Sequence, residues 1–177
     1  KDSVGGNHRT KHYVESKEDY RTLQYCIENS VLQVHEESIE EQLVSLGDDG
    51  VLFYRLDRSP YQKLLIELAG AERFLVDMYL EKELLEELMQ ILEERLLEQL
   101  DYALQSRAKL LWLPDNVTCD LTPPDAFSRY CVPYYNKLGR QCKKHGKILV
   151  VHLDGKLKGL KDLIAQADFD VVDSFSL

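Results

Sequence analysis

The sequence is short of basic residues and of long apolar runs. Its 22 Lys and Arg residues are outnumbered by 31 Asp and Glu residues, which leaves a formal net charge of −9. Nucleic-acid-binding domains usually carry a basic surplus, because contacts to phosphates supply most of their affinity. No apolar run approaches the ~18 residues that a membrane span needs. We therefore expect neither a nucleic acid nor a membrane among the partners of this protein.

Cysteine is scarce as well. The four cysteines are Cys26, Cys119, Cys131 and Cys142, and no pair has the CxxC spacing. This usage predicts a reduced protein without a disulfide framework, so we expect a cytoplasmic location. Two glycine-rich signatures of nucleotide-binding loops are also missing: no apolar run is followed by GxGxxG, and GxxxxGK followed by Ser or Thr does not occur.

Short apolar runs alternate with helical patterns along most of the chain. We predict parallel strands near residues 51–56, 109–113, 147–153 and 169–173, adjacent in chain order. Helices are expected over residues 17–29, 36–46, 60–70, 71–80, 82–107, 124–145 and 157–166. The first should begin with a capping box at Ser16 and Asp19, and Pro133 should kink the helix that contains it.

The alternation of strands and helices is typical of βαβ units around a parallel sheet. Four strands with their helices make about half of an eight-stranded barrel. We therefore predict an α/β fold, a (β/α)8 TIM barrel, of which this chain is the central part; residues 1–177 would form one domain, a fragment of a larger barrel. A Rossmann-like sheet is the alternative. Half a barrel leaves two open sheet edges, which we expect to be exposed or covered by a second copy in a homodimer.

Polar side chains follow all four predicted strands. They are Asp57 and Arg58, Asp115 and Asn116, His152 and Asp154, and Asp173 and Ser174. Active sites of barrels lie at the C-terminal ends of the strands. The sequence therefore predicts the functional site at this edge of the sheet.

The segment His152-Leu153-Asp154 is the sharpest of these patterns. Residues two apart on a strand share one side, and Gly155 would let the loop turn away directly after them. The imidazole and the carboxylate are suited to hold a metal, or to act as a base and the group that orients it. In the competing interpretation, Asp154-Gly155 is a plain turn and His152 is a hydrogen-bonded core residue.

The other strand ends supply the remaining candidates. Asp115 is assigned a catalytic role beside His152 and Asp154, although it and Asn116 could equally cap a loop. Asn116, Arg58 and Asp173 are assigned to substrate binding. Arg58 would neutralise a carboxylate or phosphate of the substrate, with a surface salt bridge as its alternative.

A family resemblance joins these observations. The segments LLWLPDNV, PPDAFSRYCVPYYNKLGRQCKKHGK and ILVVHLDGKLKGLKDLIAQADFDVVDSF resemble the central portion of the uroporphyrinogen decarboxylase superfamily. Upstream, SPYQKLLIELAGAERFLVDMYLEKELLEELM and SKEDYRTLQYCIEN resemble further parts of that family. The resemblance covers nearly the whole chain and implies a barrel enzyme.

The superfamily contains two kinds of enzyme that matter here. Its corrinoid-linked methyltransferases carry a His-x-Cys zinc motif at a strand end; His152 matches the His, and Asp154 stands where the Cys is expected. The resemblance then implies zinc held by His152 and Asp154, a corrinoid as methyl donor and a corrinoid protein as partner. Its uroporphyrinogen decarboxylases act on a tetrapyrrole without a cofactor. The His-x-Asp pattern favours the methyltransferase type with a small-molecule substrate; decarboxylation and a non-catalytic, barrel-derived binding protein are the alternatives.

Overall fold

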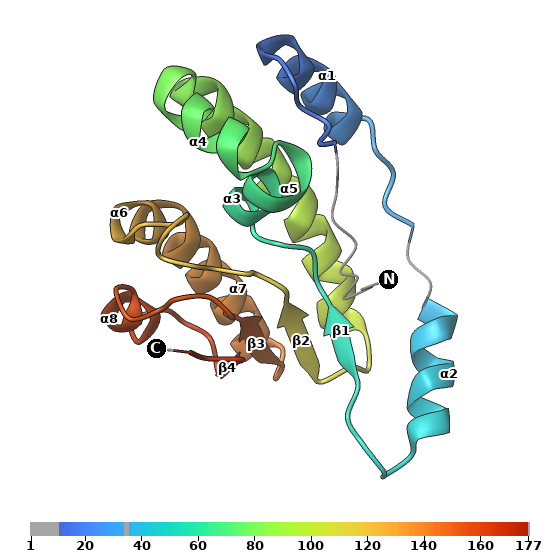
Figure 1. Cartoon of the computed structure of the whole chain (residues 1–177). Helices are drawn as coiled ribbons and strands as arrows, with labels where there is room; N and C mark the ends of the chain where they lie inside the picture. Colours follow the sequence, from blue (N-terminus) through green and yellow to red (C-terminus); the bar gives the residue numbers. More distant parts are fainter. Residues whose placement is uncertain (1–10, 34–35, 177) are drawn as a thin grey trace, which may run out of the picture.

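An open sheet of four parallel strands forms the centre of the computed structural model, which describes residues 11–33 and 36–176 (Figure 1). The strands are β1 (Phe53–Arg55), β2 (Leu110–Leu113), β3 (Ile148–His152) and β4 (Val171–Asp173). They pair in chain order and all three pairs are parallel. This confirms the predicted strands and their order, each somewhat shorter than predicted. The sheet is open within the described residues, so they do not form a closed barrel.

Helices cover one face of this sheet and leave the other uncovered. The side chains of Leu111, Leu113 and Leu149 are fully buried, and helices α5 (Lys82–Gln105) and α7 (Val132–Lys144) lie behind the strands in Figure 1. Alternation puts the neighbouring residues on the opposite face, where Phe53 and Ile148 stay 46% and 40% exposed. The sheet therefore has a helix-covered face and a helix-free face.

The remaining helices follow the predicted order; those over residues 36–46 and 71–80 have the predicted bounds, and the others are shorter or divided. The remaining helices are α1 (Lys17–Glu28), α2 (Glu36–Leu46), α3 (Pro60–Gln62), the π-helix η1 (Lys63–Leu68), α4 (Ala71–Leu80), α6 (Pro124–Ala126), the π-helix η2 (Phe127–Cys131) and α8 (Lys161–Ile164). Among the described residues, no helix combines the length and apolarity that a bilayer crossing requires.

Two predicted helices contain a π-helical turn. The helix expected over residues 124–145 is divided into α6, η2 and α7, and Pro133 lies in the first turn of α7. Proline has no N–H to donate to the preceding turn, and the wider π turn η2 lies just before Pro133, where the sequence predicted a kink.

Helices α1, α3 and α4 lie beyond the C-terminal ends of the strands (Figure 1). The predicted capping box begins α1, with the backbone N–H of Ser16 donating to Asp19 Oδ2 at 2.7 Å. The buried Tyr20 hydroxyl then donates to Asp77 Oδ2 of α4 at 2.8 Å. Before α1, the backbone N–H of Tyr13 donates to the carbonyl oxygen of Leu68 at 2.9 Å. These bonds hold the first described segment against the helices above β1.

Candidate functional site

His152 lies at the C-terminal end of β3, on the helix-free face, with a carboxylate at each ring nitrogen. Its Nδ1 is 2.6 Å from Asp173 Oδ1, and its Nε2 is 3.6 Å from Asp154 Oδ2. The side chain of His152 is 20% exposed and that of Asp154 is 42% exposed. The pair thus shares one side of the strand end, as the spacing predicted, and both side chains reach solvent.

Asn116 connects this pair to the neighbouring strand end. Its Nδ2 donates to Asp154 Oδ2 at 3.1 Å, and its Oδ1 accepts from Arg58 at 2.7 Å. Arg58 also donates to Glu67 Oε1 at 3.0 Å and to the carbonyl oxygen of Pro114. Its side chain is only 14% exposed. Arg58 therefore forms a partly buried salt bridge with Glu67, and its Nε and Nη1 donate hydrogen bonds within the protein.

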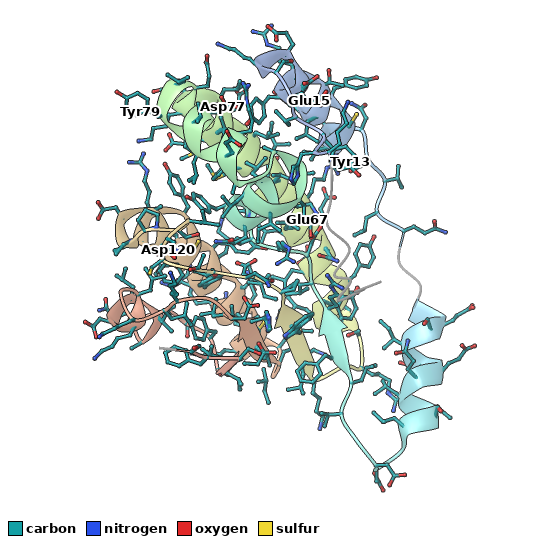
Figure 2. All side chains as sticks on the ribbon, in the orientation of Figure 1. Tyr13, Glu15, Glu67, Asp77, Tyr79 and Asp120 are labelled. Carbon is teal, nitrogen blue, oxygen red and sulfur yellow. The ribbon has the colours of Figure 1, made fainter. Side chains whose placement is uncertain are left out.

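A second cation continues the network. Lys63 Nζ lies 2.6 Å from Asp57 Oδ2 and 3.1 Å from Glu67 Oε2. Burial acts to raise the pKa of Glu67, but the charges and hydrogen bonds of Lys63 and Arg58 outweigh it and hold that pKa below its usual value. Glu67 is on the same side of the molecule as Tyr13 in Figure 2, and both line a cavity of about 400 Å³ with Lys63. In this part of the network the two cations, Arg58 and Lys63, are paired with the two carboxylates of Asp57 and Glu67.

Asp115 is not where the sequence led us to expect it. Its carboxylate is fully buried, with Oδ1 accepting from the backbone N–H of Ser59 at 2.8 Å and Oδ2 from the Tyr135 hydroxyl at 2.8 Å. Burial raises the pKa of Asp115 against the opposing effect of these bonds. The side chain points into the core because it supplies acceptors to buried donors just before α3 and on α7, so it does not line the same edge as His152 and Asn116.

The loops after β2 and β3 are joined by backbone hydrogen bonds. Gly155 N–H donates to the carbonyl oxygen of Val117 at 3.1 Å, and Cys119 N–H donates to that of Lys156 at 2.9 Å. A Cβ on Gly155 would lie 2.3 Å from the Val117 oxygen. The φ angle of Gly155 is not in the left-handed region. This glycine therefore permits the close approach of two loops, whereas we predicted that it permits a turn.

A zinc ion was expected at His152 and Asp154. Their 3.6 Å separation suits two ligands that share one ion, since zinc binds nitrogen and oxygen at about 2.0–2.2 Å in tetrahedral sites. Such sites need three protein ligands or more. Within residues 11–33 and 36–176, no group of three or more His, Cys, Asp and Glu side chains is arranged to hold a metal.

The sequence reasoning missed two contributors to this edge. Trp112 Nε1 donates to Asp173 Oδ2 at 2.9 Å. Glu67 forms salt bridges with both Arg58 and Lys63. The signal for Trp112 was its place in an apolar run, one residue away from the buried Leu111 and Leu113, which puts it on the helix-free face. The signal for Glu67 was its spacing of four residues from Lys63 on a helix.

Comparisons with known proteins bear on this site. A family model described as uroporphyrinogen decarboxylase (URO-D) matches residues 60–174. A solved methyltransferase from Methanosarcina mazei is similar with a TM-score of 0.64 and 18% sequence identity, over 77% of this chain and 40% of that one. At this identity the likeness shows the fold alone, and the chain spans 40% of that methyltransferase. No curated protein matches the sequence.

The matched range contains most of the edge described above. Asn116, His152, Asp154 and Asp173 lie within residues 60–174, whereas Arg58 lies just before them. The range also contains β2, β3 and β4 with the helices between them. The family model matches more than half of the residues of this chain, so the chain belongs to the uroporphyrinogen decarboxylase family.

Proposed function

We propose that this chain carries the site of a methyltransferase-type enzyme of the uroporphyrinogen decarboxylase family. The observation that carries the proposal is the partly exposed pair of His152 Nε2 and Asp154 Oδ2, 3.6 Å apart at the C-terminal end of β3. Enzymes with parallel β/α architecture use this edge for chemistry. The likeness to a methyltransferase fold supports the same choice.

In this proposal the described residues bind and orient the reactants. His152 Nε2 accepts a proton or binds an electrophile, and Asp154 balances the positive charge that then develops. Asn116 holds Asp154 in place at 3.1 Å, and Arg58 holds Asn116 at 2.7 Å. The substrate is a small molecule, and the methyl donor is a corrinoid presented by a partner protein. We also propose a cytoplasmic location from the cysteine usage.

Zinc is part of the proposal as a resident cofactor. His152 Nε2 and the Asp154 carboxylate would hold it, with further ligands from outside the described residues. When bound, zinc would supply Lewis-acid activation of an acceptor thiol. Asp154 in place of a thiolate makes the donor set harder, which favours weaker zinc binding than a His-x-Cys pair would give.

Porphyrinogen decarboxylation is the second candidate, because the description of the matching family model names that activity. It requires no cofactor, so it predicts activity that is insensitive to chelators. A non-catalytic binding protein is the third candidate. The fully buried Asp115 fits that interpretation, whereas the partly exposed His152 and Asp154 fit an enzyme.

The test measures both reactions on the purified protein. Methyl transfer is followed from methylcobalamin to coenzyme M with and without zinc, and decarboxylation is followed on uroporphyrinogen by product chromatography. We expect zinc-dependent methyl transfer that falls about 100-fold or more in His152→Ala. His145→Ala is the matched control, because that histidine is exposed and its ring bonds to the Gln141 carbonyl one turn earlier, before β3 begins. Decarboxylation without methyl transfer would select the second candidate, and the lack of both the third.

A further inference from the structure

We propose that Asp173 is a positioning residue that fixes the tautomer of His152, and that Trp112 holds Asp173 in place for this task. The sequence suggested that Asp173 binds substrate. In the structure both of its carboxylate oxygens already accept a hydrogen bond, one from the indole of Trp112 and one from His152. The inference rests on the proposed function only in treating His152 as the reactive side chain.

The register of the sheet brings the three side chains together. His152 of β3 and Asp173 of β4 are direct partners in the parallel pairing. Trp112 of β2 is paired with Val150, two residues before His152, and so lies on the same face. The rings of Trp112 and His152 meet edge to face, with centroids 5.6 Å apart. Strand pairing therefore fixes the distances that the hydrogen bonds require.

Trp112 sets the direction of the Asp173 carboxylate. An indole N–H is a donor only, so the 2.9 Å bond from Trp112 Nε1 places a carboxylate oxygen, Oδ2, on the indole side. The other oxygen, Oδ1, is left facing His152 Nδ1 at 2.6 Å. Asp173 is 39% exposed, so contact with Trp112 and His152 orients it rather than burial. The guanidinium of Arg55, on the neighbouring strand β1, lies 5.7 Å from the Trp112 ring centroid and restrains the indole by a cation–π contact.

The consequence is a defined state of the imidazole. A carboxylate only accepts, so Nδ1 of the neutral ring carries the proton and Nε2 carries the lone pair. That lone pair faces Asp154 Oδ2 at 3.6 Å. Two acceptors that face each other at this distance are stabilised by a cation between them, either a proton or a metal ion. Asp173 thereby makes Nε2 of His152 the basic, ligand-binding nitrogen. This is the nitrogen at which the proposed chemistry takes place.

Asp173→Asn gives the sharpest test, because the substitution keeps the shape and exchanges one acceptor for a donor. Trp112 still donates to the amide oxygen, which turns the amide NH2 towards Nδ1 of His152. The tautomer should then reverse, with the proton on Nε2 and the lone pair on Nδ1; an Asp-to-Asn exchange beside a catalytic histidine has this effect in serine proteases.

The readout is long-range 1H–15N correlation NMR of histidine-labelled protein, at a pH where the ring is neutral and without substrate or metal. The His152 signals are identified by their loss in His152→Gln. We expect the Nδ1–H form in the wild type, the Nε2–H form in Asp173→Asn, and a mixture of both in Trp112→Phe, which removes the indole donor. Asp154→Asn is the control and should keep the Nδ1–H form, because Asp154 faces the other nitrogen.

The outcomes are separable from those of the proposed function. An Nε2–H ring in the wild type, or an unchanged tautomer in Asp173→Asn with a native amide spectrum, overturns the inference whatever the enzyme catalyses. If Asp173→Asn fails to fold, Trp112→Phe decides: an unchanged Nδ1–H form in that variant removes Trp112 from the device. A wild-type protein that transfers no methyl group, with or without zinc, would instead contradict the proposed function and leave the tautomer result unaffected.

Discussion

Replacing Gly155 by alanine should disturb the candidate site through the backbone of the loop after β3. A Cβ at this position would lie 2.3 Å from the Val117 carbonyl oxygen and 2.5 Å from Thr118 Cβ. Both neighbours belong to the loop after β2. The Val117 oxygen is a backbone atom and Thr118 Cβ is bonded directly to the backbone, so neither can give way as the end of a flexible side chain would. The two loops must separate, and Asp154 moves with the one that carries it.

The magnitude follows from two contributions. Forcing an extra methyl group into a packed site typically costs about 1–3 kcal/mol. Weakening the 3.1 Å hydrogen bond from Gly155 N–H to the Val117 oxygen adds about 1 kcal/mol. We therefore expect the free energy of unfolding of Gly155→Ala to fall by about 2–4 kcal/mol. The bond between Asn116 Nδ2 and Asp154, now 3.1 Å long, should lengthen as well.

Urea denaturation measures the first effect, and the side-chain amide signal of Asn116 in 1H–15N spectra reports the second. Gly159→Ala is the matched control, because its Cβ would meet only Cys119 Cβ, at an ordinary 3.8 Å, and its φ angle is not in the left-handed region. That variant should be neutral or more stable by up to about 1 kcal/mol. Equal stabilities of the two variants, with an unshifted Asn116 signal, would refute the close-approach argument.

Three further predictions concern the core and the helices above β1. Burial raises the pKa of Asp115, so the folded protein keeps a proton that the unfolded chain releases above about pH 4. As the pH rises from there through the folded pKa, the free energy of unfolding of the wild type should fall relative to that of Asp115→Asn. Urea midpoints of the two proteins that change in parallel across that range would contradict this. Leu149→Ala, in the packed face, should cost about 2–5 kcal/mol in urea denaturation, whereas its neighbour Ile148, 40% exposed, should cost at most about 1 kcal/mol on the same change. Tyr20→Phe removes the donor to a buried carboxylate and should cost about 1–3 kcal/mol, with faster hydrogen exchange in α1; Tyr25→Phe, on an exposed position of the same helix, should leave both stability and exchange unchanged.

The π-helical turns show a limit of reasoning from propensity. The sequence around Pro133 predicts a break in a helix, because proline cannot donate. Whether that break becomes a bend or a widened turn depends on which carbonyl groups the neighbouring structure satisfies. The same limit applies to Gly155, where a glycine pattern suggested a turn and packing of another loop gave the true reason.

The sequence by itself determined the parallel strands, their order and the edge at which polar side chains gather. Unbroken apolar runs separated by capped helices allow few other arrangements, since each strand must be buried on at least one face and joined by a crossover. For the same reason His152 and Asp154 could be placed together from spacing alone: His152 ends β3, and Asp154 follows two residues later on the same side.

Only the tertiary structure decided what each of these side chains faces. Alternation gives the side of a strand and says nothing of the register between strands, which is what puts Asp173 against His152. The path of each loop is likewise set by distant partners: Asp115 turns into the core because Ser59 and Tyr135 present buried donors to it, while Asn116, the next residue, turns out to Asp154. Adjacent residues of similar chemistry thus separate into a core acceptor and a site residue, because buried donors must find acceptors wherever the fold brings them.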